Sequence, residues 1–247
     1  MLIRVIRGNQ KIHGVNKKPN RKFGVRNVNM ATFIKHTINQ NDFILHSNRT
    51  VFWEQEKILI LSDLHLGKTG HFRKSGIGVP AAIMKEDMQR FVAAIQFYKP
   101  SLVLVVGDLF HSVENKEHEL FLKWRKDLQH VRMLLVKGNH DIVPDAWYKK
   151  AGIEIAEKSW HKNNFAFVHH IEDADPGSED YFFSGHIHPA ISIKGLGKQS
   201  LRFPCFYFTE NYAVLPAFGK FTGTYLVEPA KNEKAFAVVE DSVIAHK

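Results

Sequence analysis

Five short blocks of the sequence carry side chains that can bind metal ions. They are Asp63-x-His65, Gly107-Asp108-x-x-His111, Gly138-Asn139-His140-Asp141, Val168-His169-His170 and Gly185-His186-x-His188. Each block follows an apolar run of the kind that predicts a buried strand, as Ile58–Leu61 does before Asp63. In open α/β sheets, ligands bind beyond the carboxyl ends of the strands. The five blocks are therefore expected to meet at one edge of a sheet.

The donor types in these blocks indicate which metal could bind and how many ions there would be. Carboxylates, an amide and imidazoles together suit Mn first, with Fe, Zn or a mixed pair as alternatives. None of the donors is Cys, which argues against a structural zinc site. About seven donors are too many for one tetrahedral ion, whereas two divalent ions roughly 3.5–4 Å apart would use them all. We expect Asp108 to bridge the ions, because it comes alone from a central strand.

Strand periodicity predicts the local geometry of two blocks. Alternate residues of an extended segment point the same way, so Asp63 and His65 should reach one ion or two neighbouring ions. The same argument applies to His186 and His188.

The composition bounds the fold and the cellular setting. The 247 residues, 44% of them hydrophobic, suffice for one large domain, which we expect over residues 40–247. The single cysteine, Cys205, excludes an internal disulfide and fits a reducing cytoplasm. No apolar run approaches the ~20 residues that span a bilayer, so we expect no membrane association.

Positive charge is concentrated at the start of the chain. Residues 1–29 hold eight Lys and Arg and no Asp or Glu, so only +1 of the formal +9 belongs to the rest. Such a tail can be a nucleic-acid arm or a transit peptide. Because it has no helical or strand period, we expect residues 1–30 to be a disordered basic extension, or to precede a native start at Met30.

The remaining sequence predicts strands alternating with helices, followed by a strand-rich half. Helices are expected to begin at Pro80, to span 116–129, and to span 144–152. Alternation of this kind predicts β-α-β units, and the strand-rich half predicts a second sheet packed on the first.

Together the five blocks resemble the motif set of the calcineurin-like metallophosphoesterases, over residues from about 58 to 190. The resemblance implies a four-layer α-β-β-α sandwich, in which two packed mixed sheets are flanked by helices around a dinuclear site. It implies that one ion is held by Asp63, His65, Asp108 and His188, and the other by Asp108, Asn139, His169 and His186. It also implies that His140 is the acid that meets the substrate, with Asp141 orienting it. Where the family often has His-Gly, this chain has His169-His170, and strand register favours His169 as the ligand.

Further blocks resemble a nuclease branch of this family. The block from Gly107 to His111 is similar to repair nucleases, whose extra histidine, here His111, lies in the active site. The blocks from His65 to Pro80 and from Leu201 to Phe206 are similar to the ligase-associated DNA damage response endonucleases, the PdeM family. This likeness implies a DNA substrate, with a DNA ligase and a helicase as repair partners.

The expected reaction is hydrolysis of a phosphodiester. Two metal ions would lower the pKa of a bridging water and supply hydroxide near neutral pH. His140 or His111 would then protonate the leaving oxygen. Lys68, Arg73 and Lys74 follow the first ligands and are expected to bind substrate phosphates, the alternative being a solvated charged loop.

Three functions are compatible with these features. The first is a DNA endonuclease or exonuclease of DNA repair. The second is a small-molecule phosphoesterase acting on a cyclic nucleotide or a nucleotide-linked precursor, and the third is a scaffold that has lost its chemistry. The near-neutral charge outside the tail counts against extensive DNA wrapping. The complete ligand set, with His140, counts against the scaffold.

Overall fold

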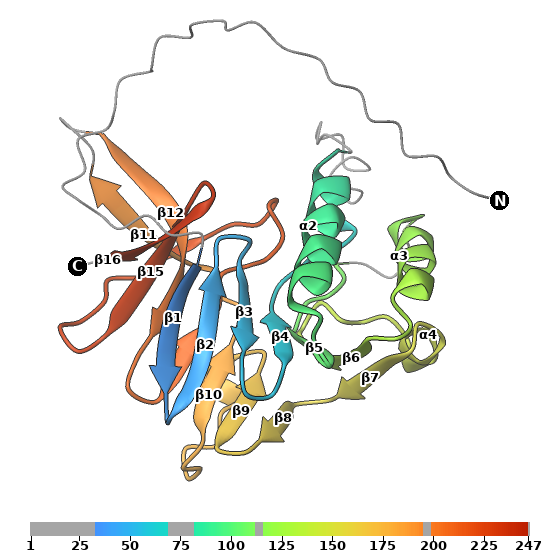
Figure 1. Cartoon of the computed structure of the whole chain (residues 1–247), viewed down its shortest axis with the longest axis horizontal. Coiled ribbons are helices and arrows are strands. Elements are labelled where there is room, and N and C mark those ends of the chain that lie inside the picture. Colours follow the sequence, from blue (N-terminus) through green and yellow to red (C-terminus); the bar gives the residue numbers. More distant parts are fainter. Residues whose placement is uncertain (1–32, 69–81, 112–115, 195–198, 247) are drawn as a thin grey trace, which may run out of the picture.

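Two mixed β-sheets packed face to face form the centre of the protein (Figure 1). The computed structural model describes residues 33–68, 82–111, 116–194 and 199–246. Strands of the first sheet follow chain order: β1 (Phe33–Ile38), β2 (Asn41–His46), β3 (Thr50–Trp53), β4 (Ile58–Leu61), β5 (Leu102–Val106), β6 (Arg132–Val136) and β7 (Ile153–Ala156). Neighbours from β1 to β4 are antiparallel, and those from β4 to β7 are parallel.

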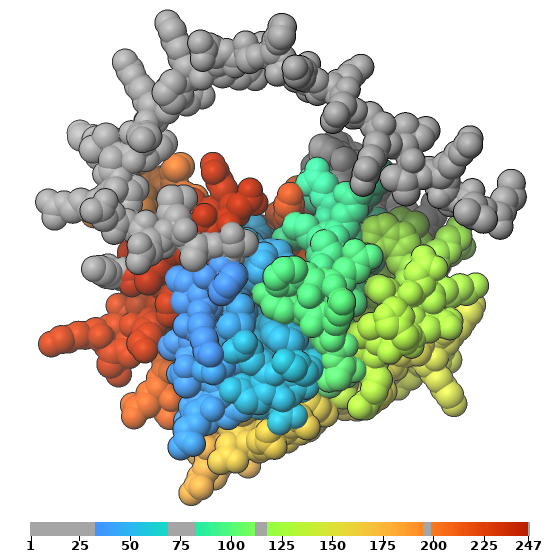
Figure 2. Space-filling model, viewed as in Figure 1, coloured from blue at the N-terminus to red at the C-terminus, as the bar shows by residue number. Residues whose placement is uncertain are grey.

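The second sheet has the order β14-β11-β12-β13-β10-β9-β8, and β15 joins it beside β12. Its strands are β8 (Ser159–Lys162), β9 (Phe165–Val168), β10 (Tyr181–Ser184), β11 (Pro189–Lys194), β12 (Ser200–Phe208), β13 (Tyr212–Val214), β14 (Tyr225–Leu226), β15 (Lys234–Val239) and β16 (Ser242–His246). β10 runs parallel to β9 and β13, whereas β11 and β12 form an antiparallel hairpin. In Figure 2 the red C-terminal strands lie beside the blue N-terminal ones, where β16 contacts β1.

The central strands are buried on both faces, which explains their continuous apolar runs. Along β4, Leu59 and Leu61 pack under the helices, while Ile58 and Ile60 face the second sheet. The core between the sheets is aromatic and contains Phe43, Trp53, Phe165, Phe167, Phe183 and Phe206.

The α-helices of the described residues cover the outer face of the first sheet. They are α2 (Ala82–Tyr98), α3 (Lys116–Asp127) and α4 (Asp145–Lys150), which contribute Met88, Phe121 and Tyr148 to the core on that side. On the outer face of the second sheet lies a single turn of 3-10 helix, η1 (Ile171–Asp173). None of the described helices has both the length and the apolar composition needed to cross a bilayer.

The predicted class, an α/β sandwich of two packed mixed sheets, is confirmed. The sequence prediction misses the strands β1, β8, β11 and β16. β1, β8 and β16 each have a single strand partner, and none has the continuous apolar run that marks β4 and β5. β11 begins with Pro189 and ends in polar residues. Within the described residues, the first strand is β1, at Phe33–Ile38.

Candidate metal centre

The ligand blocks lie where parallel strands of both sheets end. Asp63, Asp108 and Asn139 follow β4, β5 and β6, which are parallel neighbours. His169 follows β9 and His186 follows β10, which are also parallel. Because parallel strands present their carboxyl ends at the same edge, side chains that are far apart in the sequence meet here.

The first group of donors surrounds the end of β4. His188 Nε2 lies 3.3 Å from Asp63 Oδ1 and 3.3 Å from His65 Nε2. His65 Nε2 lies 4.0 Å from Asp63 Oδ1 and 3.6 Å from Asp108 Oδ2. These four residues are those that the family resemblance assigns to one ion.

The second group meets at the same oxygen of Asp108. His169 Nε2 lies 3.5 Å from Asp108 Oδ2 and 3.1 Å from Asn139 Oδ1. His186 Nδ1 lies 3.2 Å from that nitrogen of His169. Asp108 Oδ2 therefore faces both groups, in the position of a bridging ligand.

The distances between donors fit bound metal ions. Ligands about 2.0–2.2 Å from one ion lie roughly 3.0–3.5 Å from one another in tetrahedral or octahedral geometry. The closest contacts in both groups, between 3.1 and 3.3 Å, fall in this range. Imidazole nitrogens also face each other in pairs, His65 with His188 and His169 with His186, which brings lone pairs together unless a proton or cation lies between them. The residues present thus fit two divalent ions.

Two glycines allow this close approach. A Cβ at Gly107 would lie 1.9 Å from His169 Nδ1, and one at Gly138 would lie 2.2 Å from Asp108 Oδ1. Both positions therefore require glycine because a neighbouring donor occupies the space of a side chain.

The backbone at the donors differs from the extended geometry that periodicity predicts. Asp63, His65, Asp108, His186 and His188 all have positive φ, between 48° and 70°. The prediction that alternate residues of an extended segment aim these side chains is therefore wrong, since left-handed turns aim them instead. Such conformations cost about 1–3 kcal/mol each and cluster at functional sites.

Burial and pairing shift the pKa values of three donors. Burial is the largest influence on the pKa of Asp108 and would raise it, but the hydrogen bond and charge of His169, with the backbone N–H of His140, together outweigh burial, and the pKa falls to about 2. Burial would likewise lower the pKa of His169, but its hydrogen bond with Asp108 and the charges of Asp63 and Asp108 together raise it to about 9. Burial lowers the pKa of His65 to about 3, so this imidazole is neutral and able to bind a cation.

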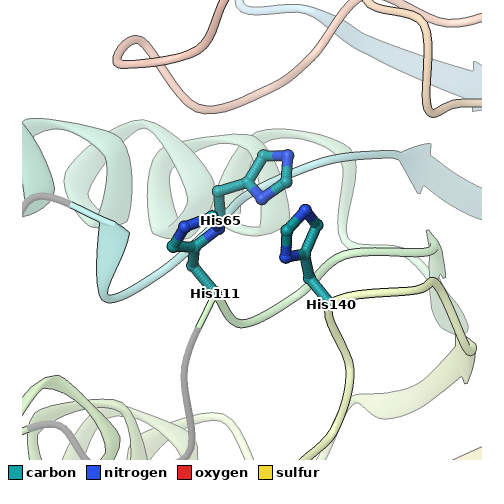
Figure 3. Close-up of side chains that lie close together, drawn as sticks. All are labelled: His65, His111 and His140. Carbon is teal, nitrogen blue, oxygen red and sulfur yellow. The ribbon is translucent and has the colours of Figure 1, made fainter. Parts of the chain in front are cut away.

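Two histidines outside both donor groups lie beside them. Figure 3 shows His111 and His140 next to His65, with ring centroids 4.5 Å apart for His111–His140 and 5.3 Å apart for His65–His140. Each of the three can offer a nitrogen within 4.8 Å of the others. The backbone N–H of His140 donates to Asp108 Oδ1 at 2.9 Å. This bond holds the residue next to the donor groups.

Asp141 has a different position from the one that the resemblance implies. Its Oδ2 accepts hydrogen bonds from the backbone N–H groups of Asp108 at 2.8 Å and Gly138 at 2.9 Å, and its Oδ1 accepts one from Phe110 at 3.2 Å. Burial raises the pKa of Asp141 to about 6. In the described residues no hydrogen bond joins its carboxylate to the His140 ring, so Asp141 orients the strand ends rather than that imidazole.

The neighbours His169 and His170 lie in different environments. His169 is 5% exposed and lies within the second donor group. His170 Nδ1 instead accepts the backbone N–H of Glu172 at 3.1 Å and caps η1. Its ring packs on that of His186, with centroids 4.3 Å apart. The register thus places His169 toward the donors, as strand period predicts.

Of the three basic residues expected to bind substrate, the structure describes Lys68, while Arg73 and Lys74 lie outside the described residues. Lys68 is half-buried, and its backbone N–H donates to the carbonyl of His65 at 3.1 Å. Burial lowers the pKa of its ammonium group, and the charge of Asp108 opposes that shift. Lys68 is thus coupled electrostatically to the donor groups.

A segment that the sequence reasoning did not single out, residues 217–220, supports the first donor group. The backbone N–H groups of Phe218 and Gly219 donate to the carbonyls of Ser62 at 2.9 Å and Asp63 at 3.1 Å. A few residues further on, the Gly223 carbonyl lies 3.1 Å from His188 Nδ1, which leaves Nε2 of that ring facing Asp63.

Two arginines hold segment 217–220 in place. Arg49 donates to the carbonyls of Ala217 and Gly219 at 3.1 and 3.2 Å, and Arg90 donates to that of Phe218 at 2.5 Å. From the sequence alone, Arg90 is three residues after Asp87 in a predicted helix, and this spacing predicts an ion pair on the helix surface. Its contact with a residue 128 positions away depends on how the chain packs.

Comparison with known proteins gives the family and the fold of the chain. Residues 56–232 match the calcineurin-like phosphoesterase family. The structure is similar to that of the nuclease MPE of Pseudomonas putida, with a TM-score of 0.74 and 22% sequence identity, over 87% of this chain and 100% of the other. That likeness concerns the fold. No curated protein matches the chain at a significant level. The family match spans well over half of the sequence, and the chain therefore belongs to the calcineurin-like phosphoesterases, a family of metal-dependent phosphoester hydrolases.

Proposed function

We propose that the protein is a phosphodiesterase with two divalent metal ions at this centre, and that its substrate is DNA. The observation that carries the proposal is the position of Asp108 Oδ2, 3.6 Å from His65 Nε2 and 3.5 Å from His169 Nε2. One carboxylate oxygen between two sets of donors suits a two-metal phosphoesterase. Mn is the ion we propose, with Fe, Zn or a mixed pair as alternatives.

The proposed ligands follow the two donor groups. Asp63, His65, Asp108 and His188 would hold one ion, and Asp108, Asn139, His169 and His186 the other. When bound, such a pair of ions activates water for attack on phosphorus and neutralises charge on the phosphoryl oxygens.

His140 and His111 are proposed to act on the substrate directly. They lie next to the donors, and the backbone bond from His140 to Asp108 fixes the position of the first. A protonated imidazole there can donate a hydrogen bond to a phosphoryl oxygen and give its proton to the leaving oxygen. Lys68, Arg73 and Lys74 remain the proposed contacts to substrate phosphates.

Several features favour DNA over a small substrate. His111 matches a position found in repair nucleases of this family, and the fold is similar to that of a protein named as a nuclease. The blocks that resemble the PdeM family lead us to propose a cytoplasmic role in DNA repair, with a DNA ligase and a helicase as partners.

The test uses the full chain with Mn²⁺, single- and double-stranded DNA, and the chromogenic ester bis(p-nitrophenyl) phosphate. Both DNA and the ester should be hydrolysed, EDTA should abolish the activity, and added Mn²⁺ should restore it. Asp108→Ala and His140→Ala should be inactive, whereas His161→Ala, which changes an exposed histidine paired with Asp180, should be unaffected. Intact DNA beside a hydrolysed ester would refute the nuclease proposal. Failure with Mn²⁺, Fe²⁺ and Zn²⁺ on every substrate would refute the phosphodiesterase proposal.

A further inference from the structure

The hairpin formed by β11 and β12 extends beyond the strand ends that carry the donors. β11 begins at Pro189, the residue after His188. Val214 of β13 pairs both with Ser184, at the end of β10, and with Tyr207 of β12. The first half of β12 therefore continues past the level at which β10 ends. Figure 1 shows β11 and β12 projecting from the body of the molecule.

Alternation along the strands defines an inner face of this hairpin. Phe206 of β12 packs between the two sheets, so Arg202 and Ser200, at alternate positions, share its side of the strand. In β11, Ser192 pairs with Arg202 and lies on the same face. Lys194 pairs with Ser200 and lies there too. The inner face of the projecting part thus consists of these two serines, the lysine and the arginine.

The outer face of the hairpin is apolar. Ile191 and Cys205 are buried with Ala235 and Ala237 of β15, and Phe203 packs against the same cluster. The two faces therefore differ in chemistry. Ala235 and Ala237 of β15, the hydrogen-bonded neighbour of β12, continue the apolar face, and the polar face lies on the side of the first sheet, whose strand ends carry Asp63, Asp108 and Asn139.

The inner face carries positive charge without a negative counterpart in its own strands. Lys194 and Arg202 are exposed, and neither β11 nor β12 contains Asp or Glu. The hydroxyls of Ser192 and Ser200 are hydrogen-bonded to each other, and both serines are exposed. Guanidinium, ammonium and hydroxyl groups are those that proteins use to contact nucleic-acid phosphates.

We propose that this inner face binds the phosphate backbone of a single polynucleotide strand whose scissile phosphate lies at the metal centre. The inference rests on the proposed function and adds to it the part of the substrate that is held away from the chemistry. Ser192, which pairs across the hairpin with Arg202, is four residues after His188. At roughly 3.3 Å per strand residue, this separation is about 13 Å. At about 3.4 Å per nucleotide, the axial rise of a strand stacked as in B-DNA, that distance corresponds to at most about four nucleotides.

This spacing makes the hairpin a determinant of substrate length. A dinucleotide or a chromogenic ester occupies the metal centre without reaching Arg202. An oligonucleotide of about 16 nucleotides, the upper end of common single-strand site sizes, reaches both. The contribution of the inner face should therefore be confined to long substrates.

The experiment compares wild-type protein with Lys194→Glu/Arg202→Glu. The matched control is Lys126→Glu/Lys150→Glu, which has the same charge change. Both control lysines are exposed, and they lie in the last turns of α3 and α4, near the starts of β6 and β7 at the opposite edge of the sheet. Binding of a fluorescein-labelled oligonucleotide is measured in EDTA over a series of salt concentrations. Hydrolysis of the oligonucleotide, a dinucleotide and bis(p-nitrophenyl) phosphate is measured with Mn²⁺.

The hairpin variant should bind the oligonucleotide at least about tenfold more weakly. The slope of log K against log salt concentration should be smaller in magnitude by about 0.7 for each lost phosphate contact. Its hydrolysis of the dinucleotide and the ester should be unchanged, and the control variant should match wild type throughout. Arg202→Lys should retain most of the binding, because it keeps the charge.

Each other outcome overturns a specific part of the argument. Unchanged oligonucleotide binding, or an equal loss in the control variant, overturns the hairpin inference. An equal loss on the dinucleotide shows that the hairpin supports the metal centre and does not bind a remote phosphate. If no substrate is cleaved while binding still depends on Lys194 and Arg202, the proposed function fails, and the hairpin is a polynucleotide-binding surface without a cleavage role.

Discussion

The backbone N–H of Asp108 donates a 2.8 Å hydrogen bond to Oδ2 of Asp141, and the N–H of Gly138 donates to the same oxygen at 2.9 Å. Asp141 is buried, with 5% exposure. One carboxylate thus joins the turn after β5 to the turn after β6. Because Asp108 has a φ of 52°, a conformation that L-residues rarely adopt, this bond helps to stabilise the residue that lies between the two donor groups.

Replacing Asp141 should therefore weaken metal binding without removing a ligand. In Asp141→Asn the amide offers one acceptor oxygen where the carboxylate offers two, so a backbone N–H loses its partner and Asp108 shifts. We expect Mn²⁺ affinity to fall about 10–100-fold, as for other groups that orient ligands. Calorimetric titration with Mn²⁺ measures this. Asp145→Asn changes an exposed carboxylate and should have no effect, and an unchanged isotherm for Asp141→Asn would contradict the role.

Replacing either of the two histidines beside the donors should lower turnover and leave the metal content unchanged. We expect His140→Gln and His111→Gln each to lower kcat by about 10²–10⁴-fold, the usual effect of losing a general acid. Metal content measured by mass spectrometry should stay at two ions per chain. A loss of one ion would show instead that His65, His111 and His140, which lie within ligating distance of one another, form a metal site of their own.

Arg90 should stabilise both the fold and the first donor group. It bonds Asp87 at 2.7 Å and the Phe218 carbonyl at 2.5 Å, and its guanidinium lies 4.3 Å from the Phe218 ring centroid. Arg90→Met should lower the free energy of unfolding by roughly 2–3 kcal/mol, because it leaves the buried Asp87 without its charge partner. Urea denaturation measures this loss. Arg132→Met removes an exposed pair with Glu154 and should cost less than about 1 kcal/mol, so equal losses would refute the role of Arg90.

His36 should make stability depend on pH below neutrality. Burial, with a smaller effect of the charge of Lys234, lowers its pKa from 6.5 to about 4 in the folded protein. Because the unfolded chain binds the proton more tightly, this contribution to stability is complete above pH 6.5 and is lost as the pH falls toward 4. His36→Phe keeps an aromatic ring beside Phe208 and Phe236 but does not titrate. The urea midpoint of the variant should therefore change less between pH 7 and pH 5 than that of wild type, and parallel changes would refute the prediction.

The strand ends that carry the donors could be predicted because the burial of these strands is visible in the sequence as continuous apolar runs. β4, β5 and β6 are buried on both faces, so each is a continuous apolar run, and the donor that follows it marks the end. The parallel arrangement then places these ends together. β1 could not be predicted in this way, since every second residue from Phe33 is exposed.

The local conformation of the donors was decided by the tertiary structure. Nothing in the sequence distinguishes Asp63 in an extended strand from Asp63 at a φ of 53°, because the turn is held by Gly219, 156 positions later. The same holds for Asp141, whose partners are backbone groups on a neighbouring strand end.

The sequence by itself therefore determined the family, the order of the strands with apolar runs, and the set of candidate ligands. Only the tertiary structure decided how these side chains are aimed, which residues support them, and which face of the β11–β12 hairpin lies toward the metal centre. The physical reason is that burial leaves a pattern of apolar residues along the chain. A hydrogen bond between two sheets, or between turns that are far apart in the sequence, leaves none.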